Sequence, residues 1–424
     1  MFLRTVFGYT FMRMQSSVAV PSSSIASPSS ESSANRQSVA SSAGTPWYCY
    51  GVVFAATCIV VGILWDISWH STIGRDTFWT PAHMVIYLGG TLGGSIGGWL
   101  VLQATFFGHA EQRAVSVKLW GFRGPIGAWV SIWGSFAMLV SAPFDNWWHD
   151  AYGLDVKILS PPHSVLAAGM YFLVFGGLLL LTSVQNRAVL RTESGAAATR
   201  PPGSWLFAYA GGVLIAMGAI MVTELSLPNH QHSASYYLTS SIVYPFYFAM
   251  LGRASKLRFP VTIAAGVYFL LSAGMMWILP LFAATPMLAP IYNPVTHMVP
   301  PAFPHLLIAP ALVIDLLFLG LGRGRGWVRS TVLAVGVATA FLGIFLLVQW
   351  NFSKFLLSAG AQNWFFAGNR FWSFADQAGP WHQQFWRTDT DPVTLAALGK
   401  IWLVALASTA VGLALGNWMS KVKR

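Results

Sequence analysis

The chain has 424 residues, of which 55% are hydrophobic and only 9% are charged. A soluble protein of this length carries far more charge, so the composition indicates an integral membrane protein. Two cysteines, Cys49 and Cys58, exclude a disulfide framework, and we interpret the net charge of +11 as a sign of membrane topology rather than of a nucleic-acid partner.

Residues 1–46 differ in composition from the rest of the chain. Residues 1–15 are apolar and basic, and residues 16–45 are rich in serine with one acid, Glu31. Because residues 16–45 hold few hydrophobic residues, residues 1–46 are expected to be a disordered tail. The scarcity of acids beside serine and arginine is also typical of an organelle transit peptide, so both interpretations stay open.

Ten apolar segments follow, most of them about 20 residues long, the length that a bilayer requires. They cover residues 47–69, 80–106, 125–147, 161–184, 204–226, 237–252, 259–283, 303–321, 328–350 and 393–418. The pattern predicts an all-α, polytopic transmembrane helix bundle of about ten spans. Residues 47–185 would form a four-span metal-binding region, and residues 186–424 a six-span C-terminal membrane region.

Basic residues and histidines divide between the two sides of this predicted bundle. The tail, the connections after the even-numbered spans and the C-terminus hold 18 of the 24 lysines and arginines. By the positive-inside rule, both termini are expected in the cytoplasm. Nine of the ten histidines fall on the outer, periplasmic side, and only His109 faces the cytoplasm. This bias predicts a metal-rich or proton-active outer face.

The connection between the first two spans reads Asp-x-x-Trp-His, then Gly-x-Asp, then Thr-Pro-x-His. Asp66 and His70 are four residues apart, so they share one face at the end of a helix. Thr80-Pro81 is typical of a helix start and places His83 in the first turn of the next helix. Two imidazoles and a carboxylate in one hairpin suit copper, iron or zinc. Helix capping by polar residues near the headgroups is the alternative.

The connection between the third and fourth spans repeats this pattern with one extra residue. The copy consists of Asp145, His149 and His163. Ser160-Pro161 takes the place of the first helix start, and Asp150 and Asp155 are competing ligands. Asp76 and Asp155 each follow their histidine by six residues, so they are candidates either for loop caps or for acceptors of imidazole N–H groups.

Four later histidines are weaker candidates, for which a water-exposed loop histidine is the simpler interpretation. They are His230, His232, His297 and His305. Asp315 lies in the middle of a predicted span, either as a buried, hydrogen-bonded acid or as part of a proton path. Trp69 and Trp148 directly precede ligand histidines and are expected to shield the sites from water. The aromatic stretch 349–379 is expected to be a re-entrant or interfacial cap.

The motif residues resemble the C subunit of the copper membrane monooxygenases, the family of particulate methane and ammonia monooxygenases. That subunit carries Asp-x3-His-x12-His with Trp-His, Arg-Asp-Thr and Thr-Pro-x-His, all of which are matched within residues 66–83. Its second site is Asn-x3-His-x13-His, and here Asp145 replaces the asparagine. The resemblance covers residues 47–185. The chain after about residue 200 has no counterpart in the family subunit, and there is no cupredoxin domain.

The resemblance implies that Asp66, His70 and His83 hold copper, while the ligand set also suits zinc or iron. It implies an oxygenase, or the metal-bearing subunit of one, acting on a small apolar substrate. The implied partners are membrane lipid and other monooxygenase-type subunits. Nucleic acid is not expected, and a homo-oligomer stays open. The alternative function is copper or zinc transport or insertion without redox turnover. A haem cytochrome is the third possibility. It needs histidines that face each other within spans, whereas the histidines here cluster at the ends of spans beside carboxylates.

Overall fold

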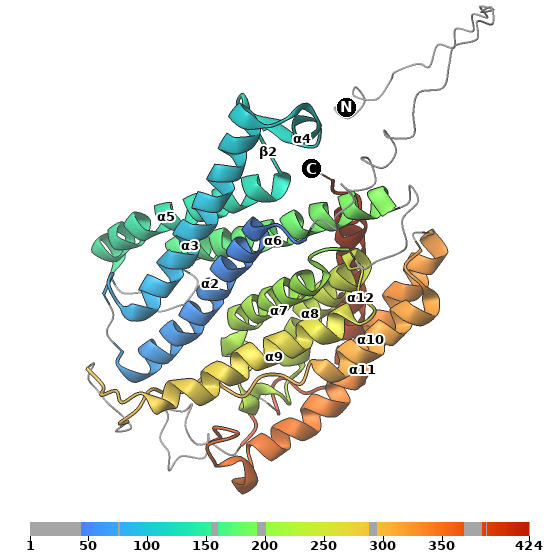
Figure 1. The fold of residues 1–424 in the computed structure, drawn as a ribbon. Helices are drawn as coiled ribbons and strands as arrows, with labels where there is room; N and C mark the ends of the chain where they lie inside the picture. The colour runs from blue at the N-terminus through green and yellow to red at the C-terminus, as the bar shows by residue number, and fades with distance from the viewer. Residues whose placement is uncertain are drawn as a thin grey trace, which may run out of the picture. The chain divides into compact units, whose positions relative to one another are not determined.

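The computed structural model describes residues 44–74, 77–153, 160–192, 201–287, 295–324, 326–368, 384–386 and 388–423. A helix occupies each of the ten predicted apolar segments, so the all-α class is confirmed (Figure 1). The predicted N-terminal tail lies outside the described residues, apart from residues 44–46.

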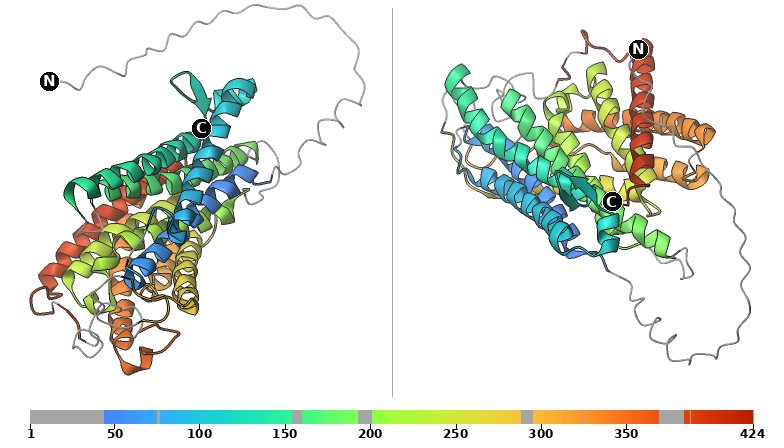
Figure 2. Two further views of the ribbon diagram at one scale, coloured as in Figure 1. Left: turned by 90° about the vertical axis from the view of Figure 1, so that its left-hand side faces the viewer. Right: turned by 90° about the horizontal axis from the view of Figure 1, so that it is seen from above.

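The first four long helices form two antiparallel hairpins. They are α2 (Trp47–Thr72), α3 (Pro81–Leu102), α5 (Ile126–Tyr152) and α6 (Pro161–Thr192). A single π-helical turn, η1 (Gln103–Phe107), prolongs α3. Helix α2 packs on α3, α3 on α5, and α5 on α6. Because the direction alternates, the α2–α3 and α5–α6 connections lie at the same end of the bundle (Figures 1 and 2).

The remaining long helices pack together in the second part of the chain. They are α7 (Ser204–Met221), α8 (Ala234–Ala254), α9 (Pro260–Ile278), α10 (Ile308–Leu321), α11 (Trp327–Leu356) and α12 (Leu395–Met419). Four 3₁₀ turns connect them: η2 (Thr223–Leu225), η3 (Pro228–His230), η4 (Leu279–Leu281) and η5 (Ala359–Ala361). The aromatic stretch 349–379, predicted as a cap, starts within the last two turns of α11. Residues 369–379 of that stretch lie outside the described residues.

Within the described ranges, eight helices are long and apolar enough to cross a bilayer, two fewer than the predicted ten. Helix α8 is long enough, but its tyrosines and serines make it less apolar. Helix α10 has 14 residues, which span about 21 Å and fall short of a hydrocarbon core about 30 Å thick. It begins at Ile308 and not near residue 303, because prolines at 300, 301 and 304 precede it and disfavour a helix.

One hydrophobic core runs through both predicted regions. Buried side chains from α2 to α12 belong to the same cluster, and α7 packs against both α2 and α6. The predicted boundary near residue 185 therefore does not divide the core.

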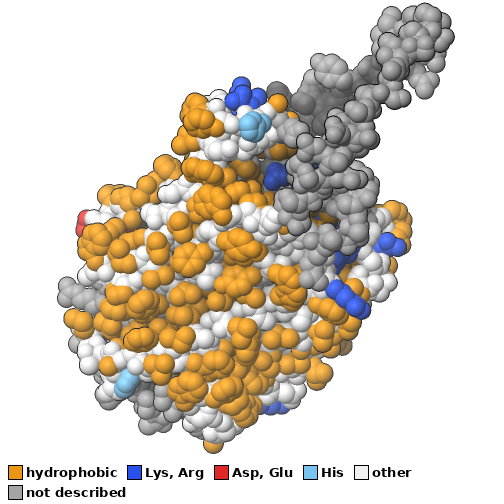
Figure 3. Space-filling model, in the orientation of Figure 1, with side chains coloured by type: hydrophobic (Ala, Val, Ile, Leu, Met, Phe, Trp, Pro, Cys, Tyr) orange, Lys and Arg blue, Asp and Glu red, His pale blue; other side chains and the backbone are white. Residues whose placement is uncertain are grey.

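In Figure 3 hydrophobic side chains cover most of the visible flank, while most visible Lys and Arg gather at the α4 end and near the α10–α11 connection. This distribution is the one expected of a protein surrounded by lipid.

Glycines allow α5 and α6 to approach each other closely. A Cβ placed on Gly134 would come within 2.6 Å of the Gly169 carbonyl oxygen, and one on Gly169 within 2.7 Å of the Gly134 carbonyl oxygen. Small residues that let backbones touch are a common basis for helix association in membranes. This contact holds the two helices side by side along the hairpin that carries the second predicted site.

A small module projects at the end of the bundle opposite the two connections (Figure 1). It consists of η1, the short helix α4 (Ala110–Ala114) and the antiparallel strands β1 (Val117–Leu119) and β2 (Phe122–Gly124). The predicted second span covers most of η1, and the rest of the module lies in the predicted connection after it. The strands were not predicted, because three residues are too few to show an alternating pattern.

Candidate metal centres

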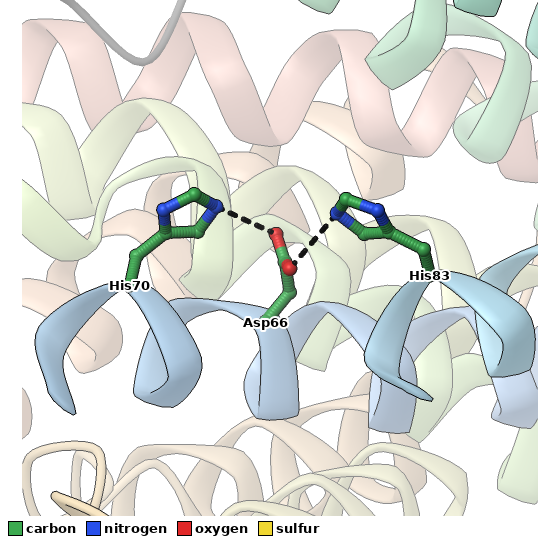
Figure 4. A group of neighbouring side chains, drawn as sticks. All are labelled: Asp66, His70 and His83. Carbon is green, nitrogen blue, oxygen red and sulfur yellow. Dashed lines mark ion pairs between the residues drawn. The ribbon is translucent and has the colours of Figure 1, made fainter. Parts of the chain in front are cut away.

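The first predicted site is assembled at the end of the α2–α3 hairpin. Oδ2 of Asp66 lies 3.7 Å from Nε2 of His70, and Oδ1 lies 3.1 Å from Nε2 of His83. Figure 4 shows Asp66 between the two imidazoles, with one carboxylate oxygen turned to each. One ligand atom of each residue lies within 4.8 Å of the others. The spacing therefore brings together the three side chains that the sequence analysis grouped.

The turn before α3 fixes the position of His83. Thr80 is the N-cap residue and Pro81 is the first helical residue, as predicted. The Thr80 hydroxyl does not cap the helix, however. It accepts the backbone N–H of Thr77 at 2.8 Å and so closes the turn, whereas Ser160 accepts the N–H of His163 at 3.4 Å in the second copy.

A hydrogen bond at Nδ1, the ring nitrogen that does not face Asp66, fixes the His83 tautomer. Nδ1 of His83 lies 2.9 Å from the carbonyl oxygen of Thr77. A carbonyl oxygen can only accept, so Nδ1 carries the hydrogen and a neutral imidazole turns the Nε2 lone pair toward Asp66. Oδ1 of Asp66 is itself buried and accepts no hydrogen bond. Two electron-rich atoms that face each other in this way require a cation between them, either a proton or a metal ion.

The second copy brings the equivalent residues together at the end of α5 and the start of α6, but there both imidazoles face one carboxylate oxygen. Oδ1 of Asp145 lies 3.5 Å from Nε2 of His149 and 3.4 Å from Nε2 of His163. Nδ1 of His149 donates to the carbonyl oxygen of Gly153 at 3.0 Å, so this imidazole also turns Nε2 to the carboxylate. Oδ1 of Asp145 is again a buried atom that accepts no hydrogen bond. Both connections thus place an aspartate against two histidines, but among the described residues only the first brings all three ligand atoms within 4.8 Å of one another.

These distances fit a metal ion with nitrogen and oxygen ligands. Bonds of about 2.0–2.2 Å, at angles from about 90° to 109°, separate neighbouring ligand atoms by about 2.8–3.6 Å. The Asp66–His83 distance of 3.1 Å and both distances to Asp145, 3.4 and 3.5 Å, fall within that range. The Asp66–His70 distance of 3.7 Å is slightly wider. A small movement of His70, whose side chain is 48% exposed, closes that gap.

Positive backbone angles at two glycines end the ligand-bearing helices. Gly74 has φ of +79° and Gly153 has φ of +83°. They are the glycines of the two Gly-x-Asp stretches, and glycine tolerates this conformation best at a helix end. Asp76 and Asp155 lie outside the described residues, so their predicted roles stay predictions. Asp150, the other competing ligand, accepts a hydrogen bond from the Asn146 amide at 3.3 Å.

The second part of the chain holds the end of α2 through two buried hydrogen bonds. The Ser68 hydroxyl donates to the carbonyl oxygen of Val299, and the Val299 N–H donates to the Thr72 hydroxyl at 2.8 Å. The Thr72 hydroxyl in turn donates to the carbonyl oxygen of Ser68 at 2.6 Å. Ser68 and Thr72 flank His70 along the helix. Sequence reasoning missed this contact, because residues 227 and 231 positions apart show no local pattern.

The later histidines are engaged elsewhere. His305 is buried, with Nδ1 2.9 Å from the Tyr244 hydroxyl. His232 lies stacked between the rings of Trp350 and Phe385, and burial lowers the pKa of its imidazole. His230 packs on Trp386, and Nδ1 of His297 lies 2.9 Å from the Thr296 hydroxyl. Among the described residues, only Asp66, His70 and His83 form a cluster of three or more ligands tight enough for one ion.

Asp315 has a structural partner at the start of α9. Its carboxylate accepts the N–H of Val261 at 3.3 Å and the N–H and hydroxyl of Thr262 at 2.7 and 2.8 Å. These N–H groups belong to the first turn of a helix, where no partner exists within the helix itself. The buried, hydrogen-bonded interpretation therefore accounts for Asp315.

No family model matches the chain, and neither a curated protein nor a solved structure matches it. The resemblance to the monooxygenase subunit therefore rests on the motif residues alone.

Proposed function

We propose that the protein is a copper-binding membrane protein that acts as an oxygenase, or as the metal-bearing subunit of a membrane monooxygenase, on a small apolar substrate. One observation carries the metal proposal. At both connections a buried carboxylate oxygen without a hydrogen bond faces imidazole nitrogens at ligand-to-ligand distances. The choice of copper rests on the resemblance of residues 66–83 and 145–163 to the ligand pattern of that family.

The chain's own residues would hold and orient the metal. Asp66, His70 and His83 supply one oxygen and two nitrogen ligands at the first centre. The Thr77 carbonyl keeps the His83 proton on Nδ1, which leaves Nε2 for the metal. Copper, when bound, supplies the activation of dioxygen. Phe78 and Tyr87, whose ring centroids lie 4.9 Å apart, form an apolar wall beside His83 against which a small hydrocarbon can rest.

More aromatic side chains pack around the second centre than around the first. Trp148 packs against Tyr152 and Phe144, with ring centroids 4.5 and 6.3 Å apart. The role of Trp148 in limiting the access of water stays a prediction, because Tyr152 beside it is 67% exposed. The corresponding role of Trp69 stays a prediction. Water exclusion strengthens the interaction of a carboxylate with a cation, because the local dielectric constant falls.

The proposed orientation places both centres at the outer face and both termini in the cytoplasm. Its support is the uneven distribution of Lys and Arg, together with the position of both connections at one end of the bundle. The opposite end carries α4, the β1–β2 hairpin and the C-terminus (Figure 2). The positive-inside rule assigns that basic end to the cytoplasm.

A metal-handling protein without redox turnover is the second candidate. The observation that favours it is the exposure of the ligands: the His70 side chain is 48% exposed and the His163 side chain 36%. A site that is open at the end of a bundle is suited to capture and release of an ion. Both candidates share the metal centres and differ in whether dioxygen is consumed.

The test is metal analysis and electron paramagnetic resonance of the purified full-length protein, followed by oxygen uptake. The proposal expects copper with nitrogen hyperfine coupling, and loss of the first-site signal in His83→Ala. His109→Ala, at the opposite end, is the control and should keep the signal. Reductant-dependent oxygen uptake with a small alkane supports the oxygenase, whereas bound copper without uptake supports metal handling. Absence of any bound metal after reconstitution with copper refutes both.

A further inference from the structure

The module at the basic end of the bundle is a short hairpin attached firmly to two long helices. The Arg123 N–H donates to the Thr105 hydroxyl at 2.7 Å, and that hydroxyl donates to the Arg123 carbonyl at 3.1 Å. On the other strand, the Trp129 indole N–H donates to the Val117 carbonyl oxygen at 3.3 Å. The hairpin is thus tied to η1 on one side and to the first turn of α5 on the other.

The hairpin has one basic face and one apolar face. Lys118 and Arg123 are direct cross-strand partners, so both cations project from the same face. The residues on the other face are Val117, Leu119, Phe122 and Gly124. Like charges directly opposite each other destabilise a strand pair. An anion that lies between Lys118 and Arg123 would remove that repulsion.

The tip of the hairpin is an exposed tryptophan in a strained conformation. Trp120 has φ of +48° and is 74% exposed, and the next residue is Gly121 with φ of +88°. Asparagine or glycine usually occupies the first of these two positions, because a bulky side chain fits poorly there. The Trp120 ring instead lies edge-on to Trp133 of α5, with centroids 5.5 Å apart.

Trp133 shows where the tip lies relative to the membrane. It is about two turns into α5, one of the helices able to cross a bilayer, and it is 41% exposed on the flank. A ring packed against the flank of a bilayer-crossing α5 would lie at the level of the lipid. Phe106 and Phe107 of η1 are 62% and 77% exposed, and the Phe106 ring lies edge-on to Phe122 of the hairpin, with centroids 6.3 Å apart. Aromatic side chains gathered in this way are typical of a membrane–water interface.

The net charge of the sequence around the hairpin favours an anionic partner. Between residues 77 and 144 the sequence has three cations, Arg113, Lys118 and Arg123, and one acid, Glu111. The Arg123 guanidinium donates to the Arg113 carbonyl at 3.4 Å, which brings these two residues together. A cluster of cations beside exposed aromatic rings fits a surface with phosphate groups above and acyl chains below.

We propose that the β1–β2 hairpin, with Lys118, Trp120 and Arg123, is a docking site for anionic phospholipid headgroups. Lys118 and Arg123 bind the lipid phosphate, and Trp120 lies among the glycerol and upper acyl groups beside Trp133. This role does not depend on the metal centres. The occupant is a lipid rather than a protein or nucleic acid, because the tip rests on a helix flank that lipid surrounds.

The experiment uses the full-length protein in nanodiscs of phosphatidylcholine with and without phosphatidylglycerol. Native mass spectrometry after detergent release counts the phosphatidylglycerol molecules that the protein retains and measures their apparent affinity. Each cation near an anionic surface strengthens binding about fivefold, so Lys118→Gln with Arg123→Gln should weaken the tightest site about 25-fold. Lys421→Gln with Lys423→Gln removes two exposed cations elsewhere and should leave that site unchanged.

Trp120→Gly tests the aromatic part of the site while keeping the turn, since glycine adopts a positive φ without strain. It should also weaken retention of phosphatidylglycerol. Equal losses in the hairpin and C-terminal double variants would show diffuse attraction and overturn the proposal. Displacement of phosphatidylglycerol from the wild type by inorganic phosphate, with no effect of Trp120→Gly, would identify a soluble-phosphate site and overturn it as well.

Discussion

Val299 donates its backbone N–H to the hydroxyl oxygen of Thr72, at a distance of 2.8 Å, although 227 positions separate the two residues. The contact joins the second part of the chain to the helix turn that bears His70. The backbone N–H of Met287 adds a further bond, to the Ile73 carbonyl oxygen at 2.9 Å. The chain after residue 200 therefore supports the end of α2, and the α2–α3 hairpin is not an independent module.

Thr72→Val should weaken metal binding at the first centre by about tenfold, because supports around a ligand contribute on this scale. Valine keeps the shape but leaves the Val299 N–H without its partner. Isothermal titration of the metal-free protein with copper measures the effect, and the centre at Asp145 serves as an internal reference. Thr91→Val, which removes an exposed intrahelical hydrogen bond, is the matched control. Equal weakening at both centres would show general destabilisation instead.

Gly153→Ala should act on the second centre alone. With φ of +83° and ψ of −168°, Gly153 has a conformation that is almost exclusive to glycine, and a Cβ there costs of order 1–3 kcal/mol. Relaxation of this strain moves the carbonyl oxygen that holds Nδ1 of His149. The expected result is loss of metal at this centre with the first centre retained, measured by metal content. Gly266→Ala, in an open part of α9, is the control.

The sequence predicted the parts of the fold that have local causes. Apolar length located the helices, and the i, i+4 spacing with the Thr-Pro and Ser-Pro starts located the two ligand groups. It did not predict the Thr77 and Gly153 carbonyl partners, because a backbone acceptor has no residue signature. Of the ten helices that occupy the predicted spans, eight are long and apolar enough to cross a bilayer. The other two are α10, which three preceding prolines shorten, and α8, whose tyrosines and serines make it less apolar.

Asp315→Leu should destabilise the protein without affecting metal content. The substitution leaves two N–H groups at the start of α9 and the Thr262 hydroxyl unsatisfied in a buried position, at about 1–3 kcal/mol for each group that water cannot reach. Asp315→Asn retains one acceptor oxygen and should destabilise the protein less than Asp315→Leu. Thermal unfolding in detergent should give the highest melting temperature for the wild type, a lower one for Asp315→Asn and the lowest for Asp315→Leu. A variant that unfolds as the wild type does but loses proton uptake would restore the proton-path interpretation.

Accessibility labelling should place the two ends of the bundle on opposite sides of the membrane. A single cysteine at Lys421 is expected to be protected from an impermeant reagent in intact cells, and one at Asp389 to be labelled. The native Cys49 and Cys58 are buried and should give a low background. Labelling of the Lys421 position alone would reverse the orientation and place both metal centres in the cytoplasm.

Asp145 occupies the position at which the resembling family has a neutral asparagine, and its carboxylate faces His149 and His163 from a single oxygen atom. An anionic oxygen ligand favours a divalent ion over Cu(I). We therefore expect the second centre to prefer Cu(II) or Zn(II), and Asp145→Asn to shift this preference toward Cu(I). Asparagine matches aspartate in size and shape, so the fold should be retained.

The measurement is metal competition on Asp145→Asn in a His70→Ala background, which isolates the second centre. Asp150→Asn in the same background is the matched control, because Asp150 lies one turn further along α5 and accepts a hydrogen bond from Asn146. A shift in Asp145→Asn alone assigns the ligand oxygen to Asp145. If Asp150→Asn shifts the preference and Asp145→Asn does not, the centre uses Asp150. The 3.4 and 3.5 Å contacts of Asp145 are then ion pairs with protonated histidines rather than a ligand set.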